Sequence, residues 1–363
     1  MRKKIVTFRI FLFLIFLINQ TETFSQRFSN KKISRIISKE KSLDGSSVAF
    51  SLGQLSNSKR IVDYNSDKLM TPGSNVKLLT LFMGLKNFDS FPILNYTKKN
   101  NKFYFWSTGY PLLKHPKKND STVVELLKSQ KDSLIYIVKK NQSESLGPGW
   151  AWDDVNYYFS PERSIFPIFG NLIKIKKTKN DKNKLDFVPK YFEDKLLDNQ
   201  LKFVNDFKFS NNKDSILIPF RTSDSLFVKL LNIELGKEIG MEFNKLELPK
   251  NFKTVYSNDK TLYELLIQDS DNLIAESIVM MTSGKGSSVF DIEKQIKTFQ
   301  NKEFSNWNDK IYWVDGSGMS RYNLLNTEFI LSVLNKIHEI LGKQGIVNLF
   351  PSHFSNYNEI GLV

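Results

Sequence analysis

Thr71-Pro72-Gly73-Ser74-Asn75-Val76-Lys77-Leu78-Leu79-Thr80 is the stretch of sequence from which both the fold and the chemistry of this chain follow. The proline and the glycine end whatever precedes them, Ser74 can begin a helix, and the apolar residues after it continue that helix. Positions i and i+3 of a helix lie on one face, about 5–6 Å apart at Cβ, so the Lys77 amine can reach the Ser74 hydroxyl. A lysine that activates a serine is a known variant of the serine nucleophile.

The Ser-x-x-Lys spacing carries little weight by itself, because a chain rich in both residues repeats it by chance. It recurs at Ser29/Lys32, Ser38/Lys41, Ser56/Lys59, Ser210/Lys213 and Ser257/Lys260. For an arbitrary copy, two solvated side chains one helical turn apart are the expected structure. The interpretation of Ser74 and Lys77 therefore depends on the motifs that follow them along the chain.

The first 25 residues are typical of a signal peptide. Basic residues at positions 2–4 precede an apolar run over 10–18, and Ser25 is a small residue suited to cleavage. An uncleaved membrane anchor is the alternative, but the run is shorter than the roughly 20 apolar residues that span a bilayer. We therefore expect export to the periplasm, with no stable membrane span after cleavage.

Composition narrows the chemistry further. The chain of 363 residues has no cysteine, which excludes disulfides, thiolate catalysis and cysteine-bound metal. His115, His338 and His353 are far apart in sequence, so neither a Ser-His-Asp triad nor a zinc site is predicted, and no cofactor is expected. The formal net charge of +14 favours anionic partners. Lysines spread along the whole of an exported chain do not indicate nucleic-acid binding.

Two polar segments lie far downstream of Ser74. Asp269-Ser270-Asp271-Asn272 separates two apolar helical stretches, and it either delivers its side chains into a cleft or simply caps the second helix. The apolar residues 311–314 predict a strand that runs into Asp315-Gly316-Ser317-Gly318-Met319-Ser320-Arg321. Glycines at this density allow close backbone approach. Arg321 offers a planar cation suited to a carboxylate.

An aromatic loop stands between these segments and Ser74. Gly147-Pro148-Gly149-Trp150-Ala151-Trp152-Asp153-Asp154 is followed by Tyr157 and Tyr158. One interpretation is an aromatic wall with a carboxylate at its rim. The other is an ordinary turn whose tryptophans pack into the core, which is the commoner use of large aromatic side chains.

Taken in order, these motifs resemble those of the low-molecular-mass class C penicillin-binding proteins, the D-alanyl-D-alanine carboxypeptidase/endopeptidase family (peptidase family S13). The resemblance extends from about Val48 to Asn323. It implies an α/β (α+β) fold, in which a transpeptidase-like or β-lactamase-like domain with an antiparallel sheet and flanking helices is interrupted by a large insertion. For this chain it places the catalytic domain at residues 26–90 and 255–363, and the inserted domain or domains at 91–254.

The resemblance also implies a reaction. The family hydrolyses the terminal D-Ala-D-Ala bond of peptidoglycan stem peptides, or peptide cross-links between strands, and β-lactams inhibit it covalently. By this likeness, Ser74 would be the acylated nucleophile and Lys77 its proton acceptor, an amine kept neutral by its surroundings. Ser270 would pass the proton to the leaving amine. Asn272 would hold Lys77 and the substrate amide.

Substrate binding is implied at two further positions. Asp154 would bind the amino group of a meso-diaminopimelate side chain, with Arg321 near the same cleft. The family's Lys-Thr-Gly or Lys-Ser-Gly signature, which supplies a cation and an oxyanion-hole strand, has no counterpart in this sequence. Loss of one oxyanion donor costs about 10²–10³ in rate.

Two hypotheses follow from this departure. In the first, the chain is a serine carboxypeptidase, either a copy cut short or an unusual form whose carboxylate site is rebuilt from Arg321 or another basic residue. In the second, it is a catalytically inactive, truncated homologue that binds cell wall without turnover.

Overall fold

The computed structural model describes residues 29–54, 59–178, 184–196, 203–209, 213–243, 248–249 and 251–350. They form two compact units, which are divided between Asp67 and Lys68. The predicted signal peptide, residues 1–25, lies outside the described residues. Within the ranges above, no helix has both the length and the apolar character that crossing a membrane requires. The division into a catalytic domain and an insertion stays a prediction.

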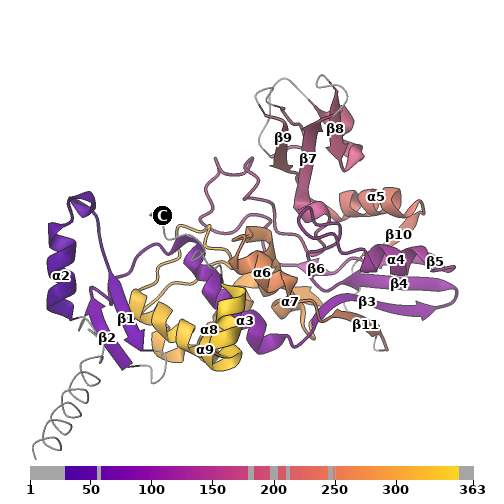
Figure 1. Ribbon diagram of the computed structural model, residues 1–363. Helices are drawn as coiled ribbons and strands as arrows, with labels where there is room; N and C mark the ends of the chain where they lie inside the picture. Colours follow the sequence, from indigo (N-terminus) through magenta and orange to yellow (C-terminus); the bar gives the residue numbers. More distant parts are fainter. Residues whose placement is uncertain are drawn as a thin grey trace, which may run out of the picture. The chain divides into compact units, whose positions relative to one another are not determined.

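The first unit contains a helix and an antiparallel hairpin (Figure 1). The helix is α2 (Asn30–Lys39), and the hairpin strands are β1 (Phe50–Gln54) and β2 (Lys59–Tyr64). The side chain of Asn30 accepts a hydrogen bond from the Asp63 amide at 2.9 Å. This bond joins the first turn of the helix to the second strand.

In the second unit, several helices pack around one central helix, α7 (Asn272–Gly284), that is buried on all sides. They are α3 (Lys77–Asn87), α6 (Thr261–Ile267), α8 (Ile292–Glu303) and α9 (Thr327–Leu349). Every residue of α7 from Leu273 to Thr282 is buried, as expected for a helix at the centre of a core. Helix α3 packs against α6, α7 and α9. The start of α3 is therefore fixed by contacts on several sides.

A five-stranded mixed sheet also belongs to this unit, with the order β10-β5-β4-β3-β11 (Figure 1). Its strands are β3 (Phe91–Lys99), β4 (Lys102–Ser107), β5 (Ser133–Ile137), β10 (Ile239–Glu242) and β11 (Lys253–Ser257). The hairpin β3–β4 is antiparallel, whereas β4–β5 and β5–β10 are parallel. Parallel neighbours require crossover connections, and α4 (Thr122–Lys128) and α5 (Asp224–Leu235) lie on these connections.

Two smaller sheets complete the unit. Strand β7 (Leu172–Lys177) lies between β8 (Leu185–Val188) and β9 (Ser215–Pro219) and is antiparallel to both. The short strands β6 (Lys140–Asn141) and β12 (Val289–Phe290) pair in parallel. Along β7 the isoleucines are buried and the lysines between them are exposed, the alternation of a strand with one solvated face. The mixed α/β fold class predicted from the sequence is confirmed.

The strand predicted over residues 311–314 is wrong. Only Tyr312 makes a ladder contact there, an isolated bridge to Leu324. The reason lies two residues further on, where the Val314 N–H donates to the side chain of Asn323 at 2.8 Å. A side chain thus takes the place of a neighbouring strand, and the segment turns instead of continuing.

Candidate active site

The four predicted catalytic side chains meet where α3 and α7 begin. Ser74 lies in a 3₁₀ turn over Gly73–Val76 that leads directly into α3, and Lys77 is the first residue of that helix. The Lys77 Nζ lies 3.0 Å from Ser74 Oγ and 2.6 Å from Asn272 Oδ1. Ser270 Oγ donates to Ser74 Oγ at 2.9 Å. Lysine and asparagine are 195 positions apart in the chain, so the helix packing creates the site.

The hydrogen bonds of Lys77 leave room for the amine to act as a base. Besides the oxygen of Asn272, its Nζ lies 2.7 Å from the backbone carbonyl oxygen of Ser317. Both of these partners can only accept a hydrogen bond from the amine. A neutral amine has two hydrogens to donate to them, and its lone pair then faces the third neighbour, the Ser74 hydroxyl.

Burial favours this neutral form. Lys77 is only 2% exposed to solvent. Burial lowers the pKa of Lys77 to about 8, although the negative charges of Glu276, Asp315 and Asp271 oppose the shift. Roughly one amine in ten is therefore uncharged at pH 7.

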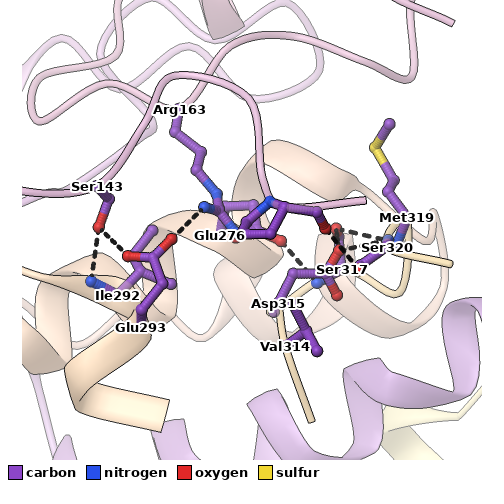
Figure 2. A network of polar contacts seen from close by, with 12 residues as sticks. Ser143, Arg163, Glu276, Ile292, Glu293, Val314, Asp315, Ser317, Met319 and Ser320 are labelled. Carbon is purple, nitrogen blue, oxygen red and sulfur yellow. Dashed lines mark hydrogen bonds and ion pairs between the residues drawn. The ribbon is translucent and has the colours of Figure 1, made fainter. Parts of the chain in front are cut away.

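A buried ion pair fixes the carbonyl that binds Lys77 (Figure 2). Glu276, on α7, accepts hydrogen bonds from Arg163 Nε at 2.9 Å and from the Ser317 amide at 2.8 Å. Burial raises the pKa of Glu276, while Arg163 opposes that shift. Arg163 also donates to Glu293 at 3.0 Å, and Glu293 in turn accepts from Ser143 at 2.7 Å. Each buried charge in this network thus has an opposite charge or a hydrogen-bond partner.

Asp315 organises the loop that follows. Its carboxylate accepts from the backbone amides of Gly318 at 2.8 Å and Ser320 at 2.6 Å, and from the side chain of Asn323 at 2.7 Å. It also accepts from Trp150 Nε1 at 2.9 Å. The aromatic loop is therefore attached to the wall of the site through Trp150. Its other tryptophan, at position 152, is 67% exposed, so the interpretation in which both tryptophans pack into the core does not hold for Trp152.

The glycine at position 318 is required by its surroundings. A Cβ there would lie 1.9 Å from the Gly73 carbonyl oxygen and 3.1 Å from the Ser74 nitrogen, and its φ is +87°. The loop thus touches the peptide group that carries the serine. Thr80, one turn after Lys77, secures the same loop by donating to the Gly316 carbonyl at 2.6 Å.

Three of the four predicted catalytic residues line a cavity of about 340 Å³. Ser74, Ser270 and Asn272 line one part of it, and Tyr158 and Phe159 line another. The side-chain amide of Asn272 donates to the Phe159 carbonyl at 2.7 Å, which anchors the aromatic segment to α7.

The two predicted substrate-binding residues are placed differently. Neither Asp154 nor Arg321 is among the described residues that line this cavity. Arg321 is exposed, and its backbone amide donates to the carbonyl of Gly149 at 3.1 Å. Asp154 is half-buried, and its amide closes a local turn onto Ala151. Their roles stay predictions.

Sequence reasoning missed His115, which also lines the cavity. Its Nδ1 accepts from the Lys117 amide at 3.3 Å, so the neutral ring carries its proton on Nε2. That nitrogen lies 3.7 Å from Oδ2 of Asp271, the residue between Ser270 and Asn272 in the sequence. Nothing in the spacing of an isolated histidine indicates this contact. Glu276 was also missed, although a single carboxylate within the apolar run of a helix is a readable signal.

The family is shown by comparison with known proteins. The chain belongs to the D-Ala-D-Ala carboxypeptidase 3 (S13) family, whose model matches residues 29–200 and 212–352. No curated protein matches the sequence significantly.

Solved structures show the same fold. Penicillin binding protein 4 (dacB) from Haemophilus influenzae is similar with a TM-score of 0.63 and 20% identity, over 83% of this chain and 77% of that one. The same protein complexed with a β-lactam gives a TM-score of 0.56 and 17% identity, over 84% and 77%. The chain is thus a D-Ala-D-Ala carboxypeptidase-type peptidoglycan enzyme by family.

Replacing Gly318 with alanine tests how closely the loop approaches the backbone of Gly73 and Ser74. Gly318→Ala places a methyl group on the Gly73 carbonyl, so we expect a loss of at least about 3 kcal/mol in the free energy of unfolding. Gly236→Ala is the matched control, because its φ is +64° but no atom lies within 4 Å of the added carbon. The control should lose only about 1–2 kcal/mol. Equal losses in urea unfolding would contradict the close approach.

His115 predicts a sensitivity to acid. Burial lowers the pKa of His115 below its usual 6.5, while Asp271 and Asp269 favour the charged ring and Lys117 disfavours it. The unfolded chain then binds the proton more readily, so the free energy of unfolding falls as the pH drops through 6.5. His115→Gln removes this titration. Between pH 7.5 and 5.5, the variant should lose less stability than the parent in urea unfolding, and an equal or larger loss would refute the assignment.

Proposed function

We propose that the protein is an exported serine-type D-Ala-D-Ala carboxypeptidase/endopeptidase that cleaves peptidoglycan stem peptides through an acyl-enzyme on Ser74. The observation that carries this proposal is the position of the Lys77 amine. It lies 3.0 Å from Ser74 Oγ, with its other two neighbours both hydrogen-bond acceptors. Membership of the S13 family supports the substrate class.

The proposed reaction begins with attack of Ser74 Oγ on the carbonyl carbon of the penultimate D-Ala. Lys77 Nζ takes the hydroxyl proton as the Oγ–C bond forms. The tetrahedral intermediate then collapses, the C–N bond breaks, and Ser270 passes a proton from the lysine to the leaving D-Ala amine. In the second half of the reaction, water takes the place of the amine. It loses a proton through Ser270 to Lys77 as its oxygen bonds to the ester carbonyl carbon, and the Oγ–C bond then breaks as Lys77 returns the proton to Ser74 Oγ, which releases the shortened peptide with a new carboxyl end.

Asn272 has two parts in this scheme. Its oxygen holds the Lys77 amine at 2.6 Å, and its nitrogen is bonded to the Phe159 carbonyl. Asp154 and Arg321 are proposed to bind the diaminopimelate end of the stem peptide. The Arg321 backbone is bonded to the same aromatic loop that carries Asp154, which supports a shared role.

Covalent labelling tests the nucleophile. We expect a fluorescent penicillin to acylate the parent protein and Ser74→Ala to show no covalent label. The matched control is Ser257→Ala, because Ser257 and Lys260 repeat the same spacing outside the site. Labelling that survives in Ser74→Ala, or no labelling of the folded parent, would contradict the proposal. The second result would instead fit a homologue that binds cell wall without turnover.

The pKa of Lys77 predicts the pH dependence of acylation. Because the base must be neutral, and its pKa is about 8, the acylation rate should rise about tenfold per pH unit below pH 8 and level off above it. Lys77→Arg should lower the rate by about 10²–10⁴, since a guanidinium does not lose its proton. Stopped-flow acylation by a penicillin measures both. A rate independent of pH between 6 and 9 would exclude Lys77 as the base.

A further inference from the structure

A second hollow of about 860 Å³ adjoins the active-site cavity. We call it the lysine groove, and define it by the residues that matter here: Tyr157, Tyr158, Lys174, Lys208, Lys213 and Leu217. Tyr158 and Leu217 line both this groove and the cavity that contains Ser74. The two spaces are therefore adjacent, and a ligand longer than the reacting dipeptide that leaves the cavity on this side would meet the groove.

Strand β7 leads from one space to the other. Leu172 lines the active-site cavity, and Lys174, two residues further along the same face, lines the lysine groove. Two residues of a strand advance roughly 6–7 Å. Leu217 of β9 is the register partner of Lys174 and so points to the same side of the sheet. Lys174 is thus placed to meet the next part of a ligand that leaves the active site.

The lysines of the groove lack a counter-charge. Within the described part of the chain, no carboxylate forms an ion pair with Lys174, Lys208 or Lys213. Two other lysines of β7 do have acidic partners: Lys176 pairs with Asp186 at 3.2 Å, and Lys177 pairs with Asp214 at 3.8 Å. Unpaired cations that converge on one hollow attract an anionic ligand, and the net charge of +14 adds to this attraction.

The aromatic side of the groove suits flat apolar rings. Tyr157 and Tyr158 are 57% and 59% exposed. Tyr157 stacks on Phe159 with ring centroids 5.5 Å apart, and Tyr158 meets the same ring edge-on at 5.7 Å. Because the Phe159 carbonyl is bonded to Asn272, these rings are held next to the catalytic residues. Rigid aromatic rings with a polar edge are well suited to cover the apolar face of a sugar.

We propose that the lysine groove binds the saccharide-proximal part of the peptidoglycan substrate, with its lysines pairing to stem-peptide carboxylates and its tyrosines covering the sugar rings. This inference rests on the proposed function, because it assumes that the dipeptide end of the same molecule occupies the active-site cavity. It makes the enzyme selective for stem peptides that are still attached to their sugars.

Binding to a variant that cannot turn over tests the groove directly. In a Ser74→Ala background, fluorescence anisotropy compares a labelled disaccharide pentapeptide with a labelled tripeptide that ends in D-Ala-D-Ala. Replacing Lys174, Lys208 and Lys213 with alanine should weaken binding of the disaccharide pentapeptide about tenfold, because each exposed ion pair contributes up to about fivefold in affinity. Binding of the tripeptide should not change. The difference should shrink at 0.5 M salt.

Matched controls separate the groove from general charge effects. Alanine at Lys176 and Lys177 removes two lysines from the same strand that already have acidic partners, and should change binding less than twofold. The double variant Tyr157→Ala/Tyr158→Ala should weaken binding of the disaccharide pentapeptide more than binding of the pentapeptide without its sugars. If the triple lysine variant binds the disaccharide pentapeptide as tightly as its parent, or loses affinity for heparin to the same extent, the groove is not a substrate subsite.

Failure of the proposed function gives a different result. If the enzyme is labelled by penicillin at Ser74 but the groove variants bind normally, only the groove assignment is wrong. If the parent is not labelled and the disaccharide pentapeptide still binds through the three lysines, the groove assignment stands and the catalytic one falls. If the parent is not labelled and the three lysines do not contribute to binding, both the catalytic and the groove assignments are overturned.

Discussion

The structure depends on keeping one amine out of water. The Lys77 amine lies buried at the first turn of α3. It is held there by two oxygen atoms that accept hydrogen bonds from Nζ, one from α7 and one from the loop after Asp315. An ammonium in such a place is unfavourable unless it is paired, so part of the amine population is neutral at neutral pH. The same burial that makes the site costly to fold lowers the pKa of Lys77, as its proposed role as the base for Ser74 requires.

The supporting contacts come from several distant parts of the chain. Arg163 holds Glu276, which holds the Ser317 amide (Figure 2). Trp150 reaches Asp315 from the aromatic loop. These groups do not touch Ser74, yet they fix the loop that does. A polar group left without a partner in a buried network of this kind is costly, so the contacts support one another. Arg163 and Trp150, which lie between α3 and α7 in the sequence, therefore support the candidate site, and a site assembled from α3 and α7 alone would lack these supports.

Much of the site could be predicted from sequence because its motifs are local. Ser74 and Lys77 lie one turn apart, and the Ser270–Asn272 turn and the glycine loop each carry their chemistry within a few residues. What could not be predicted depends on long-range packing. The contact of His115 with Asp271 follows no sequence pattern. The strand expected at 311–314 did not form because the side chain of Asn323 takes the hydrogen bond that a neighbouring strand would have made. The lysine groove needs the register of β7 and β9, which no spacing reveals.

The most direct test of the account is the titration of the Lys77 amine itself. Selective ¹³C labelling of lysine Cε, with Lys77 assigned by comparison with Lys77→Arg, gives its protonation state by NMR across pH 6 to 11. Burial of the Lys77 amine predicts a midpoint near pH 8 for the signal that Lys77→Arg removes. Burial also lowers the pKa of Lys139 to about 8, so a second signal near this midpoint is expected to remain in that variant. A midpoint at the ordinary value of about 10.4 would show an amine that is charged and exposed to solvent, and would contradict the proposed role of Lys77 as the base for Ser74.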